Sequence, residues 1–243
     1  MTPPDTLYKE AGLKDVARNL EAVRARIRDA AEKAGRDPEG VRLLAVSKTQ
    51  PPEALAAAWE AGQRDFGENY LQEALPKIAS LADRSLTWHF IGSLQSNKTR
   101  ETAEHFDWVH TVDRVSIAKR LSDQRLEELP PLHVCLQVNV SGEGSKGGVA
   151  PERLPALADA VTGLPRLKLR GLMAIPAPER SLAAQREPHR RLRELMEELN
   201  RRGHTLDTLS MGMSDDLEAA VMEGATLVRI GTAIFGARPP KGG

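Results

Sequence analysis

Residues 42–69 read RLLAVSKTQPPEALAAAWEAGQRDFGEN, and this stretch contains the repeating unit that decides the fold. Its first part, residues 42–49, is an apolar run typical of a strand that is covered on both faces. Two prolines follow, at a position that suits the first turn of a helix. Residues 53–61 then continue as a helical pattern that ends near Gly62, and residues 64–69 predict the next strand.

The same alternation of apolar runs and helical patterns continues towards the C-terminus. Further strands are predicted at residues 86–93, 108–113, 132–139, 167–175, 208–211 and 227–235. Further helices are predicted at residues 71–81, 97–105, 115–128, 151–162, 182–202 and 215–223, the last with Ser214 as its N-cap. Strands that alternate with helices are parallel, and eight such units favour a closed barrel over an open sheet. The sequence therefore predicts an α/β fold, a (β/α)8 TIM-type barrel.

A single domain is expected. The chain has 243 residues, close to the length of about 250 that is common for one α/β barrel. We expect an N-terminal helical extension at residues 1–40, the barrel at 41–238 and a tail at 239–243. Residues 7–35 of the extension read as one or two helices, with Arg24, Arg26, Arg28 and Asp29 on solvated faces.

Composition excludes several classes of function. Lysine plus arginine equals aspartate plus glutamate, at 34 each, so no overall field favours nucleic acid or an anionic membrane. The single cysteine, Cys135, excludes an internal disulfide and a cysteine metal cluster, and its apolar strand predicts an inert core thiol. No apolar stretch approaches the roughly 20 residues of a membrane span, and the N-terminus lacks a signal-peptide core. We expect a cytoplasmic protein.

Functional residues of a barrel gather where the strands end. Lys48 lies near the end of the first predicted strand, where it either reaches solvent as an ammonium or loses its charge. A neutral amine is the nucleophile that forms an imine with an aldehyde. Asn69 ends the second strand, where its amide could orient an aromatic ring or cap the next helix. His89 lies within the third strand, as a core histidine or as a catalyst.

Glycines lie near the ends of the last two predicted strands, where barrels often bind phosphate. The polar groups and turns there are Ser210, Met211, Gly212, Ser214, Gly231 and Thr232. The alternative is that these residues form only tight turns and a helix cap. Arg229 lies in the last strand; if buried, it keeps its proton and needs an acceptor. That acceptor is a carboxylate of a structural ion pair, a phosphate or a ring nitrogen.

Six segments together resemble the pyridoxal-phosphate homeostasis protein family, whose members look like the barrel domain of alanine racemase without its second domain. The segments are AVSK at 45–48, FGENY at 66–70, HFIGSLQSNK at 89–98, RGLMAI at 170–175, SMGMS at 210–214 and VRIGTAIFG at 228–236. They are in register over nearly the whole chain after the N-terminal helices. The resemblance implies a fold-type III barrel that binds pyridoxal 5′-phosphate.

The resemblance also assigns roles to the residues singled out above. It implies that Lys48 holds the cofactor as a Schiff base and that Asn69 belongs to the cofactor site. It places Ser210, Met211, Ser214, Gly231 and Thr232 around the phosphate. Arg229 matches the arginine near the pyridine nitrogen, where a guanidinium makes the ring a weaker electron sink than a carboxylate would. This favours a protein that buffers or delivers the cofactor, in vitamin B6 homeostasis, over a transaminase.

Two other functions compete with this interpretation. A pyridoxal-phosphate-dependent amino-acid racemase needs an acid/base group on each face of its substrate. The racemases take the second group, a tyrosine, from the missing domain, and neither Tyr8 nor Tyr70 is an evident substitute. A phosphosugar-processing barrel would leave the position of Lys48 as coincidence. We expect a monomer with at most weak enzymatic activity, whose partners are pyridoxal phosphate and apo enzymes that receive it, with neither nucleic acid nor membrane.

Overall fold

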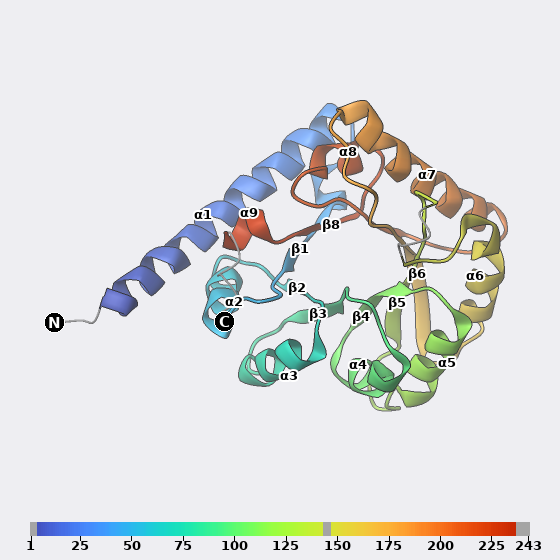
Figure 1. Cartoon of the computed structure of the whole chain (residues 1–243), viewed down its shortest axis with the longest axis horizontal. Helices are drawn as coiled ribbons and strands as arrows, with labels where there is room; N and C mark the ends of the chain where they lie inside the picture. The colour runs from blue at the N-terminus through green and yellow to red at the C-terminus, as the bar shows by residue number, and fades with distance from the viewer. Residues whose placement is uncertain (1–3, 143–146, 237–243) are drawn as a thin grey trace.

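The computed structural model describes residues 4–142 and 147–236, which form a closed barrel of eight parallel strands in sequence order (Figure 1). The strands are β1 (Arg42–Val46), β2 (Asp65–Glu68), β3 (Thr87–Phe90), β4 (Trp108–Val112), β5 (Leu132–Gln137), β6 (Leu167–Met173), β7 (Thr208–Ser210) and β8 (Leu227–Ile230). The barrel closes where Arg42 lies opposite Leu227 and Ala45 lies opposite Ile230. The predicted (β/α)8 barrel is confirmed. The tail expected at residues 239–243 lies outside the described residues.

One long helix precedes β1, and the other helices follow the strands in turn and surround the barrel. They are α1 (Pro4–Lys33), α2 (Pro52–Glu60), α3 (Leu71–Ser80), α4 (Thr99–His105), α5 (Val115–Gln124), α6 (Leu154–Thr162), α7 (Leu182–Arg201), α8 (Leu217–Met222) and α9 (Thr232–Phe235), with short 3-10 turns at Pro38–Gly40, Ser96–Lys98 and Pro151–Arg153. Helix α1 is one continuous helix that packs against α2, α8 and α9 (Figure 1). None of the helices in the described ranges has the length and apolar character required to cross a membrane.

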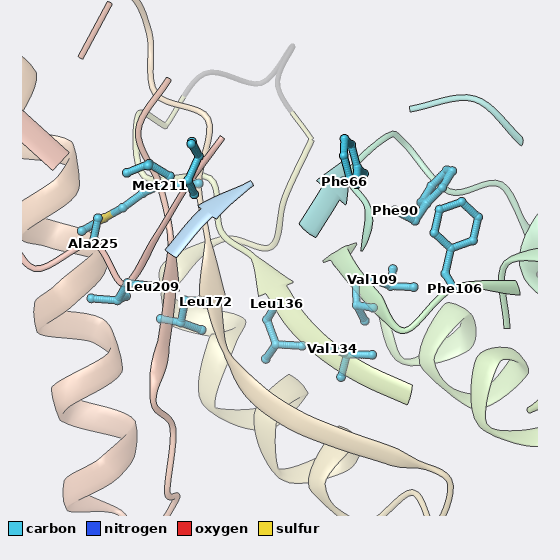
Figure 2. Close-up of a cluster of buried hydrophobic side chains, with 14 of the residues drawn as sticks. Phe66, Phe90, Phe106, Val109, Val134, Leu136, Leu172, Leu209, Met211 and Ala225 are labelled. Atoms are coloured by element: carbon cyan, nitrogen blue, oxygen red, sulfur yellow. The ribbon is translucent and has the colours of Figure 1, made fainter. Parts of the chain in front are cut away.

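Side chains alternate between the outer and inner faces of each strand. The outward set, which includes Phe66, Val134 and Leu172, belongs to one large buried cluster with residues of the surrounding helices (Figure 2). The inner face has two small apolar clusters, one around Leu44 and one around Trp108. Much of the remaining interior is polar, and that polar part leads to the candidate site.

The boundaries of several elements differ from the predictions, and two of these lie at the end of the barrel expected to bind phosphate. Strand β8 ends at Ile230, and residues expected to continue it form α9 after a turn at Gly231. Helix α8 begins at Leu217, and its N-cap position is Asp216, so the prediction of Ser214 as the cap was wrong. The Oδ1 atom of Asp216 instead accepts the backbone N–H of Met213 at 2.7 Å, which closes the loop ahead of the helix.

The prediction of solvated charged faces on the N-terminal helix was wrong for two arginines. Arg24 donates to the carbonyl of Ala61 at 2.9 Å, at the C-terminal end of α2. Arg26 donates to the carbonyl of Ser214 at 3.0 Å and pairs with Glu218 at 2.8 Å. Helix α1 therefore anchors the loop between β7 and α8. Sequence periodicity missed these contacts because their partners lie up to 192 positions away along the chain.

Candidate functional site at the barrel mouth

The predicted site residues lie on neighbouring strands at one end of the barrel. Strand β1 pairs with both β2 and β8, and β8 pairs with β7. Lys48 follows β1 and Asn69 follows β2, while Gly231 follows β8. Because the strands are parallel, their C-terminal ends share one rim, and these residues occupy one sector of it.

Hydrogen bonds of Ser47, the residue before Lys48, fix the turn on its N-terminal side. The backbone N–H of Ser47 donates to the carbonyl of Gly67 at 2.9 Å. The Ser47 hydroxyl donates to Oε1 of Glu68 at 2.6 Å, and the Ser47 carbonyl accepts from Nζ of Lys77 at 2.9 Å. All of these partners lie on β2 or α3. Ser47 is therefore fixed through its N–H, its hydroxyl and its carbonyl.

The residue after Lys48 is held as well. Thr49 has a φ of 66°, the one positive φ at a non-glycine position among the described residues. Such a conformation costs about 1–2 kcal/mol and persists where surrounding contacts enforce it. The backbone N–H of Thr49 donates to Oε2 of Glu73 at 2.9 Å. The partly buried Lys48 thus projects from a turn that is anchored on both sides.

Sequence reasoning missed Glu68 and Lys77, which form a buried ion pair beneath this turn. Their Oε1 and Nζ atoms are 2.9 Å apart. Burial raises the pKa of Glu68 above its ordinary value, although the Lys77 ammonium and the Ser47 hydroxyl act in the opposite direction. One signal could have revealed the pair: Lys77 continues the three-residue spacing of the buried Leu71 and Ala74, which places a charge on the apolar face of α3.

Asn69 does not cap the next helix, so that alternative was wrong. The N-cap position of α3 is Tyr70, and Oδ1 of Asn69 is buried without a hydrogen-bond partner. An unsatisfied buried polar atom costs about 1–3 kcal/mol. Asn69 and Tyr70 line a cavity of about 460 Å³ at the ends of β2 and β3, together with Ser93 and Lys98. The amide oxygen of Asn69 therefore lies beside this cavity without a hydrogen-bond partner among the described residues.

The polar loops after β7 and β8 divide into exposed and buried members. Ser214 and Gly231 are half-buried and Thr232 is exposed, so their polar groups are accessible at the rim. Met211 is fully buried in the outer apolar cluster, and its N–H donates to the carbonyl of Leu227 at 3.1 Å. Ser210 is also fully buried, and its hydroxyl is bonded within the barrel. The accessible donors are therefore those of Ser214, Gly231 and Thr232.

Two glycines let these loops approach their neighbours. Gly212 has a φ of 96°, and a Cβ added there would lie 2.6 Å from the Cβ of Ala220. A Cβ at Gly231 would lie 3.2 Å from the carbonyl oxygen of Val46, at the end of β1. The second contact brings the loop after β8 next to the strand that leads to Lys48.

Arg229 lies beneath these loops, 4% exposed. Its Nη1 donates to Oγ of Ser210 at 2.8 Å and its Nη2 to the carbonyl of Ala174 at 2.8 Å. Burial lowers the pKa of Arg229 to about 10, so it remains a cation at neutral pH. No carboxylate in the described ranges forms an ion pair with it, so the structural ion pair considered from the sequence was wrong.

His89 and Cys135 belong to the barrel core. His89 is fully buried and both ring nitrogens are hydrogen-bonded, which agrees with the core alternative. Cys135 is fully buried, and burial raises the pKa of its thiol to about 12. Its expected inertness follows, because a thiol reacts as the thiolate.

Comparisons with known proteins agree with this fold and place the chain. The family model described as "Alanine racemase, N-terminal domain" matches residues 18–239. The chain is thus a barrel of the alanine racemase N-terminal class. The pyridoxal phosphate homeostasis protein of Pseudomonas aeruginosa is 67% identical over 226 residues, which cover 93% of this chain and 97% of that protein. The chain belongs to the pyridoxal phosphate homeostasis protein family.

A second curated relative and a solved structure agree. The pyridoxal phosphate homeostasis protein of Escherichia coli is 56% identical over 229 residues, covering 93% of this chain and 98% of that protein. The structure of PipY from Synechococcus elongatus, with PLP bound, is 39% identical with a TM-score of 0.80. That match covers 91% of this chain and 100% of the other.

Proposed function

We propose that this chain binds pyridoxal 5′-phosphate as a Schiff base on Lys48 and buffers or delivers it in vitamin B6 homeostasis. The observation that carries the proposal is the position of Lys48 in a turn anchored on both sides, between Asn69 and the loop at Gly231. The relatives named as pyridoxal phosphate homeostasis proteins, and PipY with PLP bound, support it.

The residues at the rim fit the parts of this cofactor. A phosphate needs donors, and the hydroxyls of Ser214 and Thr232 with the first backbone N–H groups of α9 supply them. The amide of Asn69, whose oxygen lacks a partner, is suited to a ring substituent. When bound, the cofactor supplies an aldehyde carbon that accepts an amine. Lys48 is the residue of this sector whose amine would hold the cofactor through that carbon, with loss of water.

The remaining predicted residues, Ser210, Met211 and Arg229, are buried beneath the rim and support the residues above them. Ser210 holds Arg229, and the buried Met211 stabilises the loop that presents Ser214. Arg229 stays protonated and lies under the rim, and a cation beside the pyridine nitrogen disfavours a proton on that nitrogen. The ring is then a poor sink for electrons. That chemistry favours a carrier of the cofactor over an enzyme that makes carbanions.

We also propose the remaining expectations for this chain: one domain, a monomer and a cytoplasmic location. Apo enzymes that use pyridoxal phosphate are the proposed recipients. Gel filtration with light scattering tests the monomer, since a dimer would double the measured mass.

The experiment that tests the function is covalent trapping. Protein loaded with pyridoxal phosphate is reduced with borohydride, and the modified peptide is identified by mass spectrometry. We expect modification at Lys48 and loss of the imine absorbance in Lys48→Ala. Lys98→Ala is the matched control, because Lys98 lies at the same rim and is 40% exposed. An unchanged imine spectrum in Lys48→Ala would refute the assignment. Transfer of the cofactor to an apo enzyme then tests delivery.

A further inference from the structure

A continuous row of hydrogen bonds crosses the inside of the barrel. It begins at Asp65, the first residue of β2, whose Oδ1 lies 2.9 Å from Nε2 of His89. Nδ1 of His89 lies 2.9 Å from Nε2 of His110, and Nδ1 of His110 lies 2.7 Å from Oγ of Ser210. Ser210 then accepts from Nη1 of Arg229 at 2.8 Å. Strands β4 and β7 are not neighbours, so the bond between His110 and Ser210 crosses the interior.

When both rings are neutral, the two ends of the row give it one direction. An ionised carboxylate only accepts hydrogen bonds and a guanidinium only donates them. With Asp65 as the acceptor, Nε2 of His89 carries a proton and its Nδ1 accepts from His110. Nδ1 of His110 then accepts from the Ser210 hydroxyl, whose oxygen accepts from Arg229. Both rings are neutral with the proton on Nε2, and every hydrogen bond in the row has one donor and one acceptor.

Burial is consistent with this assignment. His89 and His110 are both fully buried, and burial lowers the pKa of each ring below its ordinary value. Asp65 is the charged partner at the far end. Burial alone would raise its pKa, but the bond from His89 and the nearby Arg42 lower it, so it remains a carboxylate. The ring of Trp108 stacks on the ring of His89, with 5.4 Å between the ring centroids, and this contact restricts the orientation of the His89 ring.

The row determines what Arg229 can do. With its proton committed to His110, the Ser210 hydroxyl offers only a lone pair to the guanidinium. The other acceptor of Arg229 is a backbone carbonyl, so both acceptors are neutral. The guanidinium is therefore fixed in orientation, and none of the described carboxylates lies within ion-pair distance of it.

We propose that Asp65, His89 and His110 are positioning residues that fix the Ser210 hydroxyl and, through it, aim the guanidinium of Arg229 at the cofactor ring. The final step, towards the ring, rests on the function proposed above. The direction of the row does not.

The direction is tested on the protein without cofactor. Histidine labelled with ¹⁵N, with assignments from His89→Gln and His110→Gln, reports which ring nitrogen carries the proton. We expect both rings to be neutral with the proton on Nε2 at neutral pH. A proton on Nδ1 of either ring, or a cationic ring, would overturn the row as described.

The consequence for Arg229 is tested with Asp65→Asn. The amide has the size of the carboxylate but can donate as well as accept, so it no longer imposes a direction. Asp207→Asn is the matched control: Asp207 pairs with Arg170 at 2.8 Å, and Arg170 lies over the same Trp108 ring 4.9 Å from its centroid. We expect Asp65→Asn alone to mix the proton positions, shift the absorbance maximum of bound pyridoxal phosphate and weaken its binding roughly three- to tenfold.

The outcomes separate this inference from the proposed function. If the unmodified chain binds no pyridoxal phosphate, the proposed function fails, while the ¹⁵N spectrum still decides the direction of the row. If it binds the cofactor but Asp65→Asn and Asp207→Asn have the same absorbance maximum and affinity, the positioning role is wrong. Should Asp65→Asn fail to fold, Ser210→Ala removes the last link without touching Asp65. Its absorbance and affinity are then expected to change in the same direction, and unchanged values refute the role.

Discussion

The Nζ atom of Lys77 lies 2.9 Å from Oε1 of Glu68 in a pair whose side chains are 7% and 0% exposed. The same Nζ binds the carbonyl of Ser47, and the same carboxylate binds the Ser47 hydroxyl. The charges that stabilise each other in this pair therefore also hold the residue next to Lys48. Its position makes the pair a structural part of the site, although neither residue belongs to the set predicted from the sequence.

We predict that Lys77→Met lowers the free energy of unfolding by about 3–5 kcal/mol, because it leaves the buried Glu68 carboxylate without its partner. The measurement is the urea midpoint with its slope. The control is Lys33→Met, whose partner Asp29 is 2.7 Å away in a pair that is 63% and 61% exposed. Exposed pairs contribute about 0–1 kcal/mol. Equal losses in the two variants would contradict this account.

Thr49→Gly is expected to stabilise the chain by about 1 kcal/mol, because glycine adopts a positive φ without the cost that a β-branched residue has there. Thr49→Ala removes the hydroxyl and methyl groups of the side chain but keeps Cβ, so it is expected to bring little of this gain. Chemical unfolding of both variants measures the difference. A gain of the same size from alanine would show that the Thr49 side chain, and not its φ of 66°, is responsible.

Thr232→Val is expected to weaken the binding of pyridoxal phosphate about ten- to a hundredfold and to leave pyridoxal binding nearly unchanged. The reason is that a hydrogen bond to a charged group contributes about 1.5–3 kcal/mol. Titration with each ligand by fluorescence measures this. Thr205→Val is the control, since Thr205 is also exposed but lies at the opposite end of the barrel. The same loss for both ligands would assign Thr232 to the fold.

The unfolding free energy is expected to fall as the pH is lowered from 7 to 5. Burial lowers the pKa of His133 from 6.5 to about 4, and burial lowers those of His89 and His110 as well. Between about 4 and 6.5 the unfolded chain binds more protons at His133 than the folded chain, so stability is lost as the pH drops. The raised pKa of Glu68 has the opposite sign and reduces the effect.

Urea unfolding at each pH measures this dependence. His133→Gln is expected to flatten it, whereas His105→Gln is not, because His105 is exposed. A pH profile that is the same in His133→Gln as in the unmodified chain would refute the assignment to His133.

We predict that the chain does not racemise free alanine at a useful rate. A positioned acid/base contributes about 10²–10⁴-fold, and the expected second group is absent from the residues assigned to the site. The test is exchange of the Cα proton of alanine in deuterated buffer. Tyr70 is the candidate for a second acid/base group, since it is 56% exposed and lines the cavity beside Asn69. Fast exchange with inversion that is lost in Tyr70→Phe would promote the racemase alternative.

The fold could be predicted because its signals are local. Runs of apolar residues, the helix start at Pro52 and the stop at Gly62 depend only on neighbours in the chain, and all eight strands were found. Lys48, Asn69 and Gly231 could be placed at one rim for the same reason: each follows a strand of a parallel barrel. The boundaries at Ile230 and Leu217 were missed because turns at the rim depend on contacts that periodicity does not contain.

The sequence by itself thus determined the barrel, its order of elements and the sector of the rim that carries Lys48. Only the tertiary structure decided the distant partners: His110 for Ser210 and Ala174 for Arg229. The physical reason is distance along the chain. His110 and Ser210 are 100 positions apart, and no local pattern relates them. They meet because the barrel closes with a particular register, so that two inward side chains on strands that are not neighbours come within 2.7 Å of each other.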